Sequence, residues 1–263
     1  AMVLPKFDGV YAQFLHTGKE WQAWSRTGER LLSVSEELLS DFYTYAHPER
    51  AYNGELWLPG EAHQRINGLS RKKTPQHLEV RLFDSFLPDD WVEPFHFRRE
   101  FLFEGKLTKP AQLVPTAGKI NVLEDLYDLA LALKSRGSSA YDGLILRDAE
   151  GLYRPGKGTD GEIIKIKPTI EADLRVVGTT PGKGIRAGGY GAFVVELGGG
   201  LTCEVGSGLT QSMVMGEDPT GWIVTVEFLG FTSAGMLREP RLKAIRFDKD
   251  EADTLTPTSS GED

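Results

Sequence analysis

The feature that most constrains the fold of this chain is a change in sequence pattern near Pro168. Before Pro168, short β-prone runs alternate with amphipathic segments, whereas after it helical periodicity nearly vanishes. Runs of β-prone residues then follow one another between Gly-rich turns, as expected for the strands of a small barrel. These five runs cover residues 174–179, 192–197, 201–205, 222–229 and 242–247.

A barrel of five short strands is typical of the OB-fold, which commonly binds nucleic acid. We therefore expect a first domain over residues 1–169 and an OB-fold domain over residues 170–250. Residues 251–263 carry four acidic residues and no basic one, which accounts for half of the formal net charge of −8. This polar segment is expected to be a disordered acidic tail.

The first domain is expected to combine strands with helices, which places the chain in the α+β class. Its clearest helix covers residues 122–136, with Asn121 as the capping residue and Gly137 as the stop. Two further helices are expected over residues 35–45 and 61–69. The expected strands cover residues 9–15, 51–58, 78–86 and 143–147.

Composition limits the class of protein and its compartment. The chain has 263 residues, of which 40% are hydrophobic, so it can bury a substantial core. Nowhere does an apolar run approach the roughly 20 residues that cross a bilayer, and the N-terminus lacks the pattern of a secretory signal. Cys203 is the only cysteine, which excludes intrachain disulfides and cysteine-based zinc modules. We therefore expect a cytoplasmic protein with no membrane partner.

Lys6 is the first candidate for chemistry, because Lys6-Phe7-Asp8-Gly9 stands just before an expected strand. Taken alone, Lys6 is best interpreted as a solvated surface lysine. Lys165 and Lys167 change this interpretation, since they alternate within an apolar run and should project from one face of a strand. Neighbouring like charges are unfavourable unless an anion such as a triphosphate neutralises them. The same cations would lower the pKa of Lys6 and favour the neutral amine that acts as a nucleophile.

Two carboxylates are candidates for binding a metal. Glu55 and Asp142 each stand beside a glycine at the edge of a β-prone run. Either one alone could be an ordinary turn acid. Together they could supply oxygen ligands to Mg²⁺, which prefers one or two carboxylates along with phosphate oxygens and water. Phe83 offers a ring on which a base could stack, with a place in the hydrophobic core as the alternative.

The order of these patterns resembles the six motifs of the covalent nucleotidyltransferases, the superfamily of DNA ligases, RNA ligases and capping enzymes. Residues 238–249 are the most specific part, being similar to the sixth motif of ATP-dependent DNA ligases, and the small size is similar to phage-type ligases. The six motifs, in order, resemble Lys6-Phe7-Asp8-Gly9, Ser25-Arg26-Thr27-Gly28, Asn53-Gly54-Glu55-Leu56 with Phe83, Asp142-Gly143-Leu144-Ile145, Lys165-Ile166-Lys167 and residues 238–249.

The resemblance implies an adenylation domain of antiparallel sheets with helices, followed by an OB-fold barrel, and the activity of an ATP-dependent DNA ligase. In this activity Lys6 attacks the α-phosphate of ATP, the AMP passes to a DNA 5′-phosphate, and the neighbouring 3′-hydroxyl displaces it. The barrel is expected to move between these steps. ATP is then the substrate, Mg²⁺ the cofactor and nicked double-stranded DNA the partner of a monomeric enzyme of DNA replication or repair.

The resemblance also assigns roles to single residues. Catalysis is assigned to Lys6 together with Lys165 and Lys167, which also contact the nucleotide. The remaining assignments are Arg26, Glu55, Phe83, Arg241 and Lys249 for the nucleotide, Glu55 and Asp142 for the metal, and Arg26, Lys183, Arg186 and Arg238 for DNA.

Three residues depart from the pattern of the family. Tyr11 stands where many relatives have an arginine that contacts the nick phosphate, and Leu4 replaces a common acidic residue. Other residues are therefore expected to sense the nick and to select adenine. Asp142 is one methylene shorter than the usual glutamate, so we expect it to reach the metal through water.

Two other functions remain open. An RNA ligase or a capping-type nucleotidyltransferase would share the lysine motif and the two carboxylates, although residues 238–249 argue against both. A non-catalytic OB-type nucleic-acid-binding protein would need only the barrel. It would leave Lys6, Lys165 and Lys167 unexplained.

Overall fold

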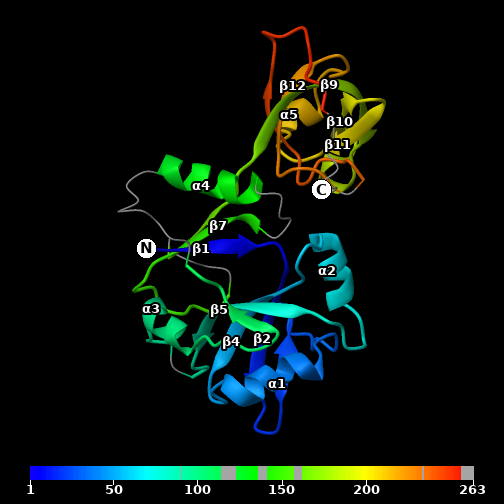
Figure 1. Ribbon diagram of the computed structural model, residues 1–263. Helices are drawn as coiled ribbons and strands as arrows, with labels where there is room; N and C mark the ends of the chain where they lie inside the picture. Colours follow the sequence, from blue (N-terminus) through cyan, green and yellow to red (C-terminus); the bar gives the residue numbers. More distant parts are fainter. Residues whose placement is uncertain (90, 114–122, 136–140, 157–161, 233, 256–263) are drawn as a thin grey trace. The chain divides into compact units, whose positions relative to one another are not determined.

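The computed structural model describes residues 1–89, 91–113, 123–135, 141–156, 162–232 and 234–255. The chain divides into two compact units, residues 1–167 and residues 168–263, and each is considered by itself (Figure 1). Among the described residues, none of the helices has both the length and the apolar character needed to cross a membrane.

The larger sheet of the first unit has five strands in the order β3-β2-β4-β5-β6, antiparallel except for the pair β5-β6. Helix α1 covers one face of this sheet, where Phe14 stacks on Phe42 with ring centroids 4.3 Å apart. Ser35 caps α1 by accepting from the backbone N–H of Leu38. The elements are β2 (Val10–His16), β3 (Trp21–Trp24), α1 (Glu36–Tyr45), β4 (Ala51–Trp57), α2 (His63–Ser70), β5 (Glu79–Phe86) and β6 (Thr108–Pro110).

The smaller sheet of the first unit has three antiparallel strands in the order β1-β7-β8. Val3 and Leu144 pack on helix α4 on one side of this sheet. On the other side, Leu4 and Ile145 pack with Phe83 of β5, so the two sheets of the unit meet face to face. The elements are β1 (Met2–Phe7), α3 (Phe95–Arg98), η1 (Arg99–Phe101), α4 (Leu123–Ser135), β7 (Tyr141–Arg147) and β8 (Ile163–Ile166).

A buried ionic cluster joins the two sheets through Asp84 of β5. One carboxylate oxygen accepts from Arg98 Nε at 2.8 Å, and the other accepts from Arg147 Nη2 of β7 at 2.8 Å. Arg98 is fully buried, and its Nη1 also donates to the backbone oxygens of Glu93 and Gly151. Because the charges are paired and most of the remaining donors are used, the cluster fixes the contact between β5 and β7.

The second unit is a five-stranded barrel in the order β11-β10-β9-β12-β13, with a core that includes Val176, Phe193 and Val226. The backbone N–H of Leu242 donates to the oxygen of Ser207 at 2.9 Å, which brings the last strand back to the end of β11. The elements are β9 (Ile170–Pro181), η2 (Gly184–Arg186), β10 (Tyr190–Gly198), β11 (Leu201–Val205), α5 (Gln211–Val214), β12 (Ile223–Phe228) and β13 (Arg241–Ile245).

The predicted α+β class and the barrel after the first unit are confirmed. Helix α4 matches the predicted helix over residues 122–136, although its predicted caps Asn121 and Gly137 lie outside the described residues. Strands β1, β3 and β6 and helix α3 were not predicted. Lys6 accordingly lies inside a strand rather than just before one. Pro5 obscured β1, which is an edge strand, where proline is tolerated.

Residues 251–255 differ from the disordered tail predicted to begin at residue 251. The backbone N–H of Asp253 donates to the oxygen of Asp173 at 2.7 Å, and that of Leu255 donates to the oxygen of Leu197 at 2.6 Å. Leu255 also packs on the barrel core. Local polarity suggested disorder, but pairing with β9 and β10 orders this stretch. Residues 256–263 lie outside the described residues.

Replacing Asp84 with alanine should destabilise the first unit strongly, because two arginines would then be buried without a partner. The expected loss in the free energy of unfolding is about 3–5 kcal/mol. Chemical denaturation followed by tryptophan fluorescence measures it. As a control, Glu37→Gln removes an exposed ion pair with Lys106 and should change stability little. Equal effects of the two substitutions would contradict the role assigned to the cluster.

Candidate functional site

Lys6 lies on the face of β1 that turns towards the larger sheet. Its Nζ donates to Asp142 Oδ2 at 2.8 Å, and the Lys6 side chain is 20% exposed while that of Asp142 is 3% exposed. The register of β1 with β7 shifts between Lys6 and Phe7. Opposite Lys6 stands Gly143, where a Cβ would meet the backbone oxygen of Ile166 at 2.0 Å. A glycine is therefore required for β7 to approach β8 closely beside the lysine.

Asp142 binds a second cation through the same oxygen, since Lys167 Nζ lies 2.9 Å from Oδ2. Burial raises the pKa of the Asp142 carboxyl, but hydrogen bonds and charge from Lys6 and Lys167 outweigh it, so the pKa is lowered. Asp142 is thus an ionised carboxylate shared by two of the three lysines predicted from the sequence. Its other oxygen, Oδ1, is buried and makes no hydrogen bond to any described residue.

Lys165 takes no part in that cluster. It lies on β8 opposite Ile145, which places it on the face that turns towards the larger sheet. Its side chain is exposed. The sequence predicted that Lys165 and Lys167 would need an anion to offset their repulsion. The structure shows that Lys167 already has one in Asp142 and that Lys165 remains on the surface.

Glu55 projects from β4, opposite Tyr11 of β2 and Arg81 of β5. Burial raises the pKa of Glu55 to about 7, against the lowering effects of Lys6, Arg26 and a hydrogen bond from the backbone N–H of Gly9. A Cβ at Gly9 would lie 2.2 Å from the backbone oxygen of Leu56 and 2.7 Å from Glu55 Cγ. The glycine of the lysine motif therefore makes room for the glutamate.

Tyr11, noted in the sequence only as a departure from the family, is part of a polar cluster on the same sheet face. Its hydroxyl donates to Asn53 Oδ1 at 2.8 Å, and Gln13 Nε2 donates to that oxygen at 3.0 Å. Burial raises the pKa of Tyr11, so its phenol stays neutral. The guanidinium carbon of Arg26 lies 5.4 Å from the centroid of the Tyr11 ring. Among the described residues Arg26 has no ion pair, so this ring is its support.

Phe83 is half-buried and packs with Leu4 and Phe95 between the two sheets. Its ring centroid lies 6.3 Å from that of Tyr11. Phe83 therefore lies partly in the hydrophobic core, which is the alternative position predicted from the sequence. The part of the ring that is not buried is the part that a ligand could reach.

A divalent metal fits this site in a limited way. The described residues contain no group of three or more His, Cys, Asp or Glu that could hold a metal ion alone. Mg²⁺, however, commonly uses one or two carboxylates and takes its other ligands from phosphate and water. The buried Oδ1 of Asp142 is such an oxygen, ionised and without a hydrogen-bond donor among the described residues.

The predicted residues of the second unit differ in how they are held. Arg241 lies on β13, largely exposed, with Nε 3.9 Å from Glu227 Oε1. Lys249 contacts Asp173, as does Arg246. Lys183 is exposed beside η2, and Arg238 is partly buried and follows Leu237. These residues do not form one cluster within the unit.

Arg186, expected from the sequence to bind DNA phosphate, makes two hydrogen bonds within the barrel. Its Nη1 donates to the backbone oxygens of Gly191 at 2.9 Å and Gly206 at 2.8 Å. These bonds pin the connection between β9 and β10 onto the barrel. Arg186 therefore holds this connection through Nη1, and its assignment to DNA phosphate stays a prediction.

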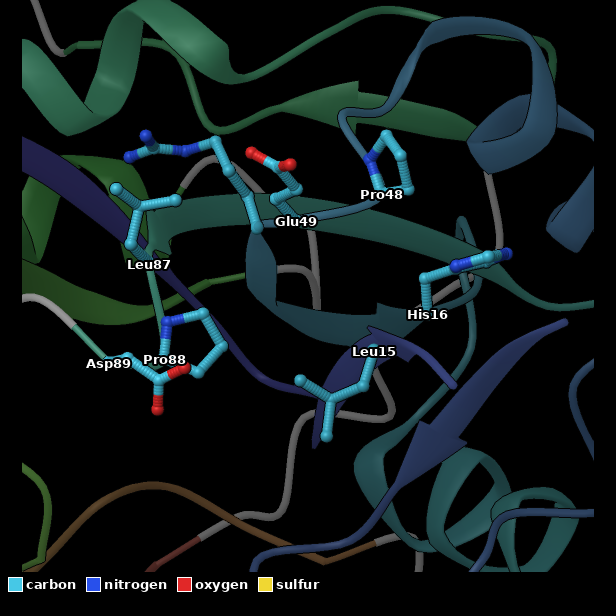
Figure 2. A pocket seen from close by; sticks show the side chains of 8 residues that line it. Leu15, His16, Pro48, Glu49, Leu87, Pro88 and Asp89 are labelled. Atoms are coloured by element: carbon cyan, nitrogen blue, oxygen red, sulfur yellow. The ribbon is translucent and has the colours of Figure 1, made fainter. Parts of the chain in front are cut away.

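A pocket of about 460 Å³ opens at the end of β2 (Figure 2). It is lined by Leu15 and His16 together with the turns around Pro48 and Pro88. None of the residues predicted to act in chemistry lines it. The pocket therefore does not mark the candidate site, which is the pair of sheet faces that carry Lys6 and Glu55.

Comparisons with known proteins find matches for both units of the chain. Residues 181–246 match the DNA ligase OB-like domain. A DNA ligase of African swine fever virus (isolate Warthog/Namibia/Wart80/1980) is 28% identical over 181 residues, covering 66% of this chain and 43% of the relative. A DNA ligase of Methanothrix thermoacetophila is 27% identical over 301 aligned residues, covering 95% of this chain and 53% of the relative. The chain thus spans about half the length of these relatives.

Solved structures extend the similarity to the fold. A structure from an analysis of Lig E DNA ligases matches with a TM-score of 0.74 and 20% identity, over 93% of this chain and 92% of that chain. The ATP-dependent DNA ligase of bacteriophage T7, in complex with ATP, matches with a TM-score of 0.53 and 18% identity, also over 93% and 92% of the two chains. The chain therefore has the fold of ATP-dependent DNA ligases, a nucleotidyltransferase unit followed by an OB-fold unit, and its sequence is similar to DNA ligases.

Proposed function

We propose that this protein is an ATP-dependent DNA ligase that binds AMP covalently on Lys6 and seals nicks between a 3′-hydroxyl and a 5′-phosphate. The observation that carries the proposal is the cluster of Lys6, Asp142 and Lys167. It places a partly exposed amine on a buried carboxylate and beside a second cation. An ordinary surface lysine has neither partner.

Lys6 must be a neutral amine when it attacks the α-phosphate. Lys6 Nζ is hydrogen-bonded to Asp142 Oδ2, so this contact has to be exchanged before attack. The phosphates of ATP provide the means, because they offer Lys167 and Lys165 an alternative anion. Asp142 and Glu55 would hold Mg²⁺, which when bound would supply further positive charge to the phosphate oxygens. Pyrophosphate leaves as the bond from Lys6 Nζ to phosphorus forms, and the amine proton is released.

The same residues serve the later steps. AMP passes from Lys6 to the 5′-phosphate of the nick, which returns the amine to Lys6, and the 3′-hydroxyl then displaces AMP. Each step is a phosphoryl transfer, in which positioning and charge stabilisation supply most of the catalysis. Glu55 is suited to the ribose or the metal, Phe83 to the adenine and Arg26 to the ribose or a DNA phosphate. Arg241 and Lys249 are proposed to orient pyrophosphate, and Lys183 and Arg238 to contact DNA.

Incubation with ATP labelled at the α-phosphate and Mg²⁺ should transfer the label to the protein, because Lys6 forms a covalent bond to phosphorus. The adduct is expected to survive denaturing electrophoresis, to be absent in Lys6→Ala and not to form from labelled GTP. Lys106→Ala, which removes an exposed lysine paired with Glu37, is the matched control and should label normally. A wild-type protein that fails to label would remove the enzymatic function.

A substrate comparison separates the ligase classes. Nicked duplex DNA should be sealed at least about tenfold faster than nicked duplex RNA, which corresponds to about 1.4 kcal/mol in the barrier. Single-turnover assays with the pre-labelled protein measure both rates. A preference for RNA would favour the RNA ligase, and transfer of the nucleotide to a diphosphate end would favour a capping enzyme.

The Glu55→Gln substitution should stabilise the protein, because the raised pKa shows that burial disfavours the ionised form. The folded state binds this proton more tightly than the unfolded state does, so its stability falls as pH rises from about 4.5 to about 7. The gain from Glu55→Gln should therefore grow across this range and level off above it. Denaturant titrations at pH 5, 6, 7 and 8 measure it, with the exposed Glu29→Gln as control. A gain that does not change with pH would contradict the assignment.

A further inference from the structure

Asp173 of the barrel binds two cationic side chains near the end of residues 238–249, those of Arg246 and Lys249. Its Oδ2 accepts from Arg246 Nη1 at 2.8 Å and from Lys249 Nζ. Its Oδ1 accepts from the hydroxyl of Thr225, its register partner on β12, at 2.5 Å. Asp173 is only 6% exposed. The hydrogen bonds and charges of its partners outweigh burial and lower its pKa, so it is ionised.

The backbone of Asp173 is fixed as firmly as its side chain. Its N–H donates to Asp253 Oδ2 at 2.7 Å, and its oxygen accepts from the N–H of Asp253 at 2.7 Å. Asp173 therefore stands at a point where strand β9, strand β12 and the chain after β13 converge. A carboxylate held in this way presents its oxygen at a defined place.

The two cations that share this oxygen are not equivalent. Arg246 is used by two carboxylates, since its Nε and Nη2 also donate to Asp248 at 2.9 and 2.7 Å. Among the described residues, the Lys249 ammonium forms an ion pair with Asp173 only, and it has three N–H donors. The Lys249 side chain is still 38% exposed. Lys249 thus has donors left for a ligand, whereas Arg246 has the pattern of a structural clamp.

We infer that Asp173 is the positioning residue for Lys249: it holds the ammonium by one donor and leaves the other two donors available to bind the pyrophosphate of ATP. This inference rests on the proposed function, in which Lys249 orients the leaving group, and adds a residue that no motif singled out. The effect of Asp173 on catalysis passes through Lys249, and it concerns the one step that releases pyrophosphate.

The test compares two steps of the same protein. In Asp173→Asn, which keeps the shape and removes the charge, lysyl-AMP formation from ATP should be slower by at least about tenfold. Sealing of a nick that already carries AMP releases no pyrophosphate and should stay within about twofold of wild type. That second rate also shows that the variant is folded and binds DNA. A variant that simply unfolds would lose both.

A double-mutant cycle shows whether Asp173 acts through Lys249. Lys249→Ala should slow lysyl-AMP formation on its own, and adding Asp173→Asn to it should cause little further loss. If the losses in rate of the two single substitutions multiply in the double variant, the inference is overturned. Faster labelling by Asp173→Asn would also overturn it, because Asp173 would then hold Lys249 away from the nucleotide. Glu171→Gln is the matched control, because it removes a neighbouring carboxylate of β9 whose partner is Lys243, and it should label at the wild-type rate.

If the wild-type protein does not label with ATP at all, the proposed function fails and this inference fails with it. If the wild type labels and seals but Asp173→Asn labels equally fast, only the inference fails. The two failures are therefore distinguishable in the same set of assays.

Discussion

The first unit depends on one buried ionic contact, the pairing of Asp84 with Arg98 and Arg147. Asp84 belongs to the larger sheet and Arg147 to the smaller one, so this contact joins the strands that carry Glu55 and Tyr11 to those that carry Lys6 and Asp142. Burying three charges is costly, and only good geometry with most donors satisfied offsets the cost. Such a cluster tolerates little displacement, so it sets the separation of the two faces more sharply than apolar packing alone.

The lysine and arginine side chains on these two sheet faces are held by contacts that leave them able to bind an anion. Lys6 and Lys167 share a single carboxylate oxygen, Oδ2 of Asp142. Among the described residues, Arg26 contacts the ring of Tyr11 and forms no ion pair with a carboxylate. Glu55 differs from these cationic residues. It carries a carboxyl group, and burial opposes the ionisation of that group. In the proposed function, a polyphosphate with its metal would complement these groups.

Much of the fold could be predicted because the relevant signals are local. Ser35 and the spacing of apolar residues define α1, and the Gly-separated runs after Pro168 define the barrel strands. Strand β1 was missed because Pro5 and Lys6 carry weak strand signals, and only pairing with β7 makes them a strand. Residues 251–255 were misjudged for a related reason, since they are ordered by contacts with β9 and β10 that composition does not record.

The sequence by itself determined which residue types are present and in what order, and hence the α+β class, the barrel and the candidate lysines and carboxylates. Only the tertiary structure decided how they are used. It placed Lys167 rather than Lys165 on Asp142, bound Arg186 Nη1 to the backbone of the barrel, and brought Tyr11 under Arg26. The physical reason is that helix and turn signals depend on neighbours a few residues away. Ion pairs and ring contacts instead join residues far apart in sequence, and strand register decides which of them meet.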